Sequence, residues 1–145
     1  MEKFRTKYFS SDEMIYSSTA RKLGIDNTPS EEVCEHLKEL MLVLDEIRAG
    51  WGSPIHVNSG FRCDRLNTAV GGSKTSVHKI GYAADLYPWN NRISKFIDYM
   101  LEWAKTHDFD QLILEENSKG SRWVHIGLYN NKHGQRKQIK NMKVK

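Results

Sequence analysis

The chain lacks the features that mark disulfide-rich secreted proteins and membrane proteins. It has two cysteines, Cys34 and Cys63, in 145 residues, and its longest apolar run, residues 40–44, is far too short to cross a bilayer. Cys34 falls within an expected helix, and we expect both thiols to be free. A cysteine-rich zinc site is excluded, so any metal must be bound by histidine and carboxylate ligands.

No signal peptide is visible either, because residues 1–7 contain no apolar segment. We therefore expect synthesis in the cytoplasm and no membrane insertion. The sequence contains no internal repeat and no low-complexity segment. With 39% hydrophobic and 28% charged residues it has the composition of an ordinary globular protein, and its length fits one domain over residues 1–145.

Acidic residues are absent from residue 132 onward, although the rest of the chain has 18 acidic and 16 basic residues. The positive net charge of +4 therefore belongs to residues 132–145, which we interpret as a basic terminal strand or tail. Such a segment either keeps the protein soluble or attracts an anionic polymer such as nucleic acid or bacterial cell wall. No nucleic-acid-binding motif accompanies it, so we expect no nucleic-acid partner. The basic residues are Lys132, Arg136, Lys137, Lys140, Lys143 and Lys145.

The hydrophobic pattern predicts an α+β domain. Thr28, Pro29 and Glu31 have the spacing of a helix start with threonine as N-cap. Short loops join the late strands, which favours a mainly antiparallel sheet flanked by helices. Helices are expected over residues 11–22, 28 to about 50, 61–67 and 90–107, and strands over residues 54–60, 83–87, 110–115, 123–129 and 135–142, the last at the sheet edge.

Two side chains that can bind metal stand seven positions apart between residues 76 and 85. His78 precedes a glycine turn, and Asp85 lies in the apolar strand that follows. A third ligand should come from another rigid element, and His125 in strand 123–129 is the best candidate. The remaining histidines, His36, His56, His107 and His133, are not expected to be ligands, and His36 is expected to be exposed on its helix.

Strand alternation supports this trio. Successive side chains of a strand point to opposite faces, so Ala83 and Asp85 share a face, as do Trp123, His125 and Gly127. Neighbouring strands can therefore present Asp85 and His125 together, while Ala83 and Gly127 leave room beside them. Two histidines and one carboxylate leave the fourth position of Zn²⁺ open for water, which is the pattern of a catalytic site.

The spacing S-x-H-x-x-G-x-A-x-D at residues 76–85, followed by W-x-H at residues 123–125, resembles the zinc-ligand motif of the D-Ala-D-Ala carboxypeptidase and phage endolysin family of zinc peptidases. Residues 28–31, 59–62 and 111–115 resemble the phage and prophage members. The resemblance implies a Hedgehog/DD-peptidase fold, bound Zn²⁺ and hydrolysis of peptide bonds in bacterial peptidoglycan stem peptides. It leaves open whether cleavage is terminal or internal.

The resemblance also implies roles for particular residues. His78, Asp85 and His125 would be the metal ligands. Arg62 would hold a carboxylate or carbonyl of the substrate, and Ser76 would line the site. We further expect a monomer that acts at the bacterial cell wall after phage-type release.

The general base of this family is often a carboxylate three residues before the last ligand, where this sequence has Arg122. We predict that Glu115, at the end of strand 110–115, is the base, with Glu116 as the alternative. Only one of the two can face the metal, because strand side chains alternate. The arginine at position 122 also keeps open a non-catalytic, zinc-containing cell-wall-binding module of the same fold.

Overall fold

The computed structural model describes residues 1–129 and 134–145. Its elements are α1 (Ser11–Ile15), α2 (Ser18–Leu23), α3 (Glu31–Trp51), β1 (Ile55–Ser59), α4 (Asp64–Ala69), the 3-10 helix η1 (Val77–Ile80), β2 (Ala83–Pro88), α5 (Ile93–Ala104), β3 (Gln111–Asn117), β4 (Arg122–Gly127) and β5 (Gln138–Val144). None of the helices in the described part of the chain has the length and apolar character needed to cross a bilayer. Both cysteines are free.

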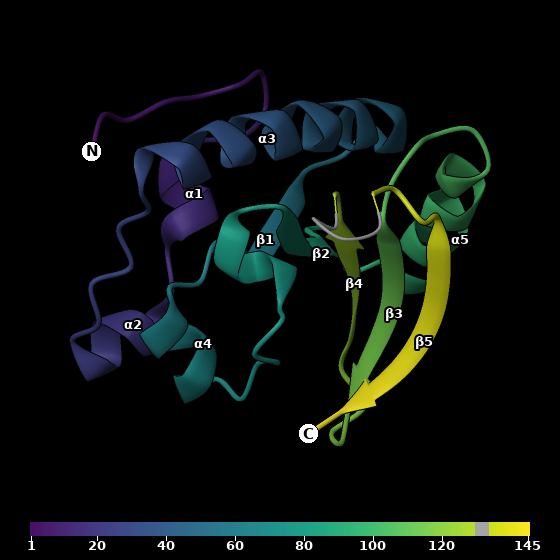
Figure 1. The fold of residues 1–145 in the computed structure, drawn as a ribbon. Coiled ribbons are helices and arrows are strands. Elements are labelled where there is room, and N and C mark those ends of the chain that lie inside the picture. The colour runs from purple at the N-terminus through teal and green to yellow at the C-terminus, as the bar shows by residue number, and fades with distance from the viewer. Residues whose placement is uncertain (130–133) are drawn as a thin grey trace.

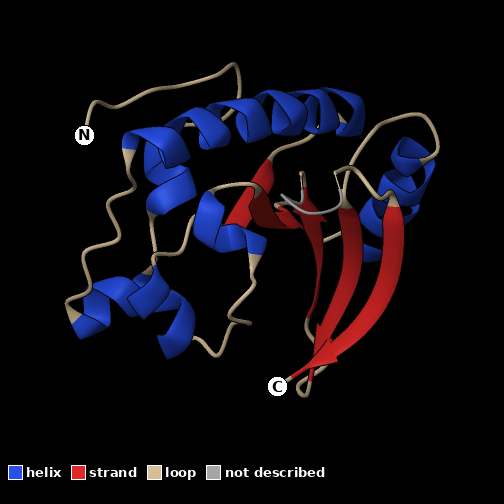
Figure 2. Ribbon diagram, in the orientation of Figure 1, coloured by secondary structure: helices blue, strands red, loops and turns tan. Residues whose placement is uncertain are grey.

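The five strands form one sheet in the order β1-β2-β4-β3-β5 (Figure 1). The pairs β1–β2, β2–β4 and β3–β4 are antiparallel, and β3–β5 is parallel. The α+β class and the mainly antiparallel sheet are therefore confirmed. Helices α1, α2 and α4 lie on the β1 side of the molecule, and β3 and β5 lie on the opposite side (Figure 2).

The core lies between one face of the sheet and the helices α3 and α5. Alternation along β2 and β4 sends Leu86, Val124 and Ile126 to this face, where all three are fully buried. The buried residues of α3 follow the helical period: they are Cys34, Leu37, Leu40, Met41, Leu44 and Ile47. The opposite face of the sheet remains available for polar side chains.

The expected start of α3 at Thr28 is wrong. Ser30 is the N-cap, and its hydroxyl accepts a hydrogen bond from the Val33 amide at 3.2 Å. The Thr28 hydroxyl instead donates to Asp26 at 2.7 Å. Thr28 and Ser30 are both residue types that can cap a helix. The hydrogen bond to Asp26 holds Thr28 in a local turn before the helix, and Ser30 is left as the cap.

The single helix expected over residues 11–22 is two helices. Ser10 and Glu13 form a capping box at the start of α1. Tyr16 has extended backbone angles, and Ser17 then caps α2 by accepting a hydrogen bond from the Ala20 amide at 3.1 Å. The second N-cap explains the break, because it stabilises a new helix start only one residue after the extended Tyr16.

Candidate metal centre

Strands β2 and β4 bring Asp85 and His125 side by side. The two residues are register partners, and Ala83 is the partner of Gly127. Strand alternation predicts this arrangement, and the register confirms it. A Cβ atom at Gly127 would lie 3.3 Å from Nε2 of His125, so the glycine gives the imidazole space over the strand.

His78 reaches the same place from η1, the short helix before β2. The Ser76 hydroxyl accepts a hydrogen bond from the His78 amide at 3.3 Å and caps this helix. Gly81 ends it with a φ of 82°, and a Cβ there would lie 2.9 Å from Cγ1 of Val33. The turn therefore needs glycine both for its backbone angle and for the close approach of α3.

The tautomer of His78 follows from its surroundings. Its Nδ1 lies 2.7 Å from the carbonyl oxygen of Gly60, and the side chain is only 2% exposed. Because a carbonyl oxygen can only accept, Nδ1 carries the proton and donates it to Gly60. Nε2 is left with its lone pair, directed toward Asp85. A backbone partner that fixes the ring in this way is typical of a metal-binding histidine.

The three side chains converge on a small volume. Oδ1 of Asp85 lies 3.1 Å from Nδ1 of His125 and 3.4 Å from Nε2 of His78. One ligand atom from each residue lies within 4.8 Å of the others. Within residues 1–129 and 134–145, this is the one group of three or more histidine, cysteine or acidic residues with such a geometry.

The charges in this cluster suit metal binding. Burial opposes the charge of Asp85, but the neighbouring imidazoles of His78 and His125 hold the pKa of its carboxyl well below its usual range. Burial lowers the pKa of His78, and the nearby Asp85 offsets only part of this effect. The cluster therefore offers an ionised carboxylate and a neutral imidazole, the protonation states that a metal ion requires.

Glu115 lies beside the cluster on β3. Its Oε1 is 3.8 Å from Nδ1 of His125, and its side chain is 14% exposed. Burial, with a smaller contribution from the charge of Asp85, raises the pKa of Glu115. Glu116 points to the other face of the sheet, where it lies 3.8 Å from Nζ of Lys143. Of the two candidate bases, Glu115 is thus the one near the cluster.

Arg62 lies between β1 and α4. Its backbone amide donates to the carbonyl oxygen of His78 at 3.1 Å, which ties the two segments together. Burial lowers the pKa of its guanidinium, whereas the charges of Asp85 and Glu115 raise it. The Nε group of Arg62 is buried and has no hydrogen-bond partner within the described residues. A buried donor without a partner carries a free-energy cost, which favours a role for this side chain in binding a ligand.

A cavity of about 620 Å³ opens over the cluster. Arg62, Ser76, Glu115 and Trp123 line it together with the three cluster residues. Its volume is in the range of pockets that bind small ligands or short peptides. The structure thus brings every predicted site residue to one cavity, while the roles of these residues stay predictions.

Arg122 shows why position 122 does not supply a base. It shares a face of β4 with Val124, away from the cluster, and its Nη2 donates to Oγ of Ser94 at 2.7 Å. The carboxylate nearest the cluster comes instead from the adjacent strand, as Glu115.

His36 differs from its expected exposed position. It is half-buried on α3, its Nδ1 lies 2.7 Å from the carbonyl oxygen of Ile80, and its ring stacks on Tyr82 at 4.1 Å. His36 therefore connects α3 to the end of η1 and to Tyr82. Periodicity along α3 did not reveal this contact, because its partner lies 44 residues away.

The remaining histidines lie apart from the cluster. His56 is exposed on β1 and packs edge-on against Trp89. His107 stacks on Trp103, and its Nδ1 lies 2.8 Å from the carbonyl oxygen of that residue. His133 lies outside the described residues.

Two histidines and a carboxylate, open to a cavity with a further carboxylate beside them, have the composition of a metal-dependent hydrolase site. A family model described as Peptidase M15 matches residues 7–127, a span that includes all of these side chains. The chain belongs to the peptidase M15 family, a family of metal-dependent peptidases, and the predicted resemblance is confirmed. No curated protein matches the chain.

Proposed function

We propose that this peptidase is zinc-dependent and hydrolyses peptide bonds in the stem peptides of bacterial peptidoglycan. The observation that carries the proposal is the convergence of His78, Asp85 and His125, with ligand atoms within 4.8 Å of one another, on a cavity that also contains Glu115. The family match supports the peptidase activity, and the resemblance of the motif to cell-wall peptidases supports the substrate.

The donor set fits zinc. His78 would bind through Nε2, because its Nδ1 donates to Gly60, and His125 would bind through Nδ1, the nitrogen nearest Asp85. Imidazole nitrogens and one carboxylate are common ligands of catalytic zinc. A bound Zn²⁺ ion would lower the pKa of a coordinated water to about 7 and polarise the carbonyl of the scissile peptide bond.

Glu115 has the position and the environment of a general base. Burial favours its neutral form, and its carboxylate can therefore take a proton from the attacking water and release it again. The same carboxyl group can then protonate the amine that leaves. The Arg62 guanidinium lies close enough to influence the charge of Glu115 and can bind a carboxylate or carbonyl oxygen of the substrate.

Ser76 has a contact that defines its contribution more narrowly. Its hydroxyl already accepts a hydrogen bond from the His78 amide, so it positions that histidine while it lines the cavity. We propose that Ser76 holds the start of η1, the helix that carries His78, and that Arg62 makes the main contacts to the substrate.

The non-catalytic alternative rested on the arginine at position 122. Arg122 faces away from the cluster, and Glu115 places a carboxylate 3.8 Å from Nδ1 of His125, so the arginine at position 122 does not leave the cluster without an acidic neighbour. A module that only bound cell wall would have no need for an acidic side chain buried in this position. The catalytic interpretation is therefore better supported.

Digestion of purified peptidoglycan tests the proposal, with released peptides identified by mass spectrometry. Zinc-loaded protein should release stem-peptide fragments, and a chelator should abolish the release. Glu115→Gln should lower the rate of peptide release at least about 100-fold while zinc binding is retained. The matched control Glu116→Gln should release peptides at the wild-type rate. No chelator-sensitive product from the wild-type protein would refute the proposed activity, and equal losses in both variants would refute the assignment of the base.

A further inference from the structure

Strand β5 lies beyond the part of the chain that the family model matches. The match ends at residue 127, and β5 pairs in parallel with β3 through seven residue pairs, from Gln111 with Gln138 to Asn117 with Val144. The family match therefore says nothing about what β5 contributes. Its position beside β3, the strand that carries Glu115, gives it a place at the site.

Several contacts fix the start of β5. Arg136 donates to the buried Asp110 carboxylate through Nε at 2.8 Å and Nη2 at 2.9 Å. The Lys137 amide donates to the carbonyl oxygen of Phe109 at 2.9 Å, and the side chains of Gln111 and Gln138 are joined at 3.0 Å. A two-point arginine–carboxylate pair holds a defined geometry. These contacts hold β5 in a defined position in the sheet.

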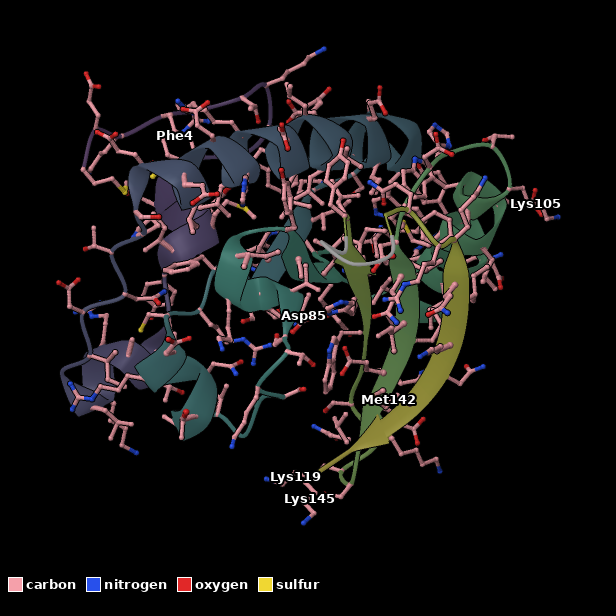
Figure 3. The ribbon with its side chains drawn as sticks, in the orientation of Figure 1. Phe4, Asp85, Lys105, Lys119, Met142 and Lys145 are labelled. Carbon is pink, nitrogen blue, oxygen red and sulfur yellow. The ribbon has the colours of Figure 1, made fainter. Side chains whose placement is uncertain are left out.

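The register decides which side chains of β5 face the site. Met142 is the partner of Glu115, and paired residues project to the same face of a sheet. Met142 and Val144 accordingly line the cavity over the metal cluster, together with Ile113 of β3. Figure 3 labels Met142 on β5 and Asp85 on β2, and the strands β4 and β3 lie between these two strands. Ile139 is the partner of Leu112 and belongs to the other face.

We propose that β5 forms a substrate subsite in which Met142, supported by Ile113 and Val144, contacts an aliphatic side chain next to the scissile bond. This inference rests on the proposed peptidase function and deepens it. Met142 is 43% exposed, so part of its surface is open for a ligand to cover. A methionine adapts its shape to different aliphatic partners, which suits a peptide-binding wall.

The distances allow this contact. Neighbouring strands are about 4.8 Å apart, and an extended peptide advances about 3.3 Å per residue. A substrate that crosses the strands with its scissile bond beside Glu115 would bring one of its flanking residues opposite Met142. Edge strands usually carry charges that discourage pairing, as Lys140 and Lys143 do here. Met142 lies between these lysines in the sequence. It is an apolar residue at the position where β5 is paired with Glu115 and lines the cavity.

Paired variants on β5 test the subsite. Met142→Ala removes the proposed contact, and Ile139→Ala is its matched control, since Ile139 is 49% exposed on the opposite face of the same strand. The probes are synthetic stem peptides of peptidoglycan in which successive positions carry glycine, alanine, leucine or aspartate, so that their choice does not depend on observed cleavage. Two measurements are made: kcat/KM for each peptide, and peptide affinity in the Glu115→Gln background, which requires no turnover.

Wild-type protein should prefer leucine to glycine at one flanking position, and Met142→Ala should reduce this preference about threefold to tenfold, mainly through KM. Ile139→Ala should leave the preference unchanged, and thermal unfolding should show that both variants are folded. An unchanged leucine-to-glycine ratio of affinities in Met142→Ala would overturn the subsite. If the wild-type protein cleaves none of the peptides but Met142→Ala still lowers the leucine-to-glycine ratio of affinities, the result would count against the peptidase proposal and support the subsite.

Discussion

Replacement of Asp85 by asparagine should abolish most of the stabilisation that zinc gives to the folded protein. Oδ1 of Asp85 lies within 3.4 Å of both histidine nitrogens of the cluster, and asparagine keeps its shape while removing its charge. A ligand that binds only the folded state stabilises it by about 2.7 kcal/mol when its free concentration is about 100 times its dissociation constant. For a chain of this size, that corresponds to a rise in Tm of about 10 °C.

The expected loss in the variant can be worked out in the same way. Changes in residues that only support metal ligands weaken binding by about 10- to 100-fold, so loss of a ligand charge should cost at least about 100-fold. At the same zinc concentration, the stabilisation then falls to about 0.4 kcal/mol. The rise in Tm should shrink from about 10 °C to about 1–2 °C.

Thermal unfolding followed by circular dichroism measures this difference, with each protein examined in zinc and in chelator. His56→Ala is the control, because His56 is an exposed histidine that packs against Trp89 away from the cluster. Its zinc-dependent rise in Tm should equal that of the wild type. An equal rise in Asp85→Asn and in the wild type would refute the assignment of Asp85 as a ligand, whatever the stability of the variant without zinc.

Two further predictions concern the substrate and the core. Arg62→Met should lower kcat/KM about 10- to 100-fold, mainly by raising KM, because it removes a charged donor whose Nε has no partner within the described residues; steady-state kinetics that match the wild type would contradict this role. Leu44→Ala should lower the free energy of unfolding by about 2–5 kcal/mol in denaturant titrations, since Leu44 is fully buried on α3, and a change below about 1 kcal/mol would contradict the packing described for that helix.

The pairing of Asp85 with His125 could be predicted from sequence because it depends on a local rule. Side chains alternate along any strand, so the two residues share a face once their strands are neighbours. The orientation of His78 could not be predicted in this way. It depends on the carbonyl oxygen of Gly60, 18 residues earlier, and sequence patterns do not specify such a contact.

Non-local pairing also explains what else the sequence left undetermined. The lysines of the final strand predict an edge position, but its parallel pairing with β3 depends on the path of the whole chain. The half-buried position of His36 depends on Ile80 and Tyr82, which come from segments far along the sequence. The start of α3 was ambiguous for another reason, since Thr28 and Ser30 can both cap a helix.

A zinc titration of the metal-free protein, with the release of peptides from peptidoglycan as the readout, tests whether this chain is a zinc-dependent peptidase. We expect no release without metal, a linear rise with added zinc, and a plateau at one ion per chain. Release that persists in the fully chelated protein, or that fails to appear when one zinc ion per chain is bound, would contradict this expectation.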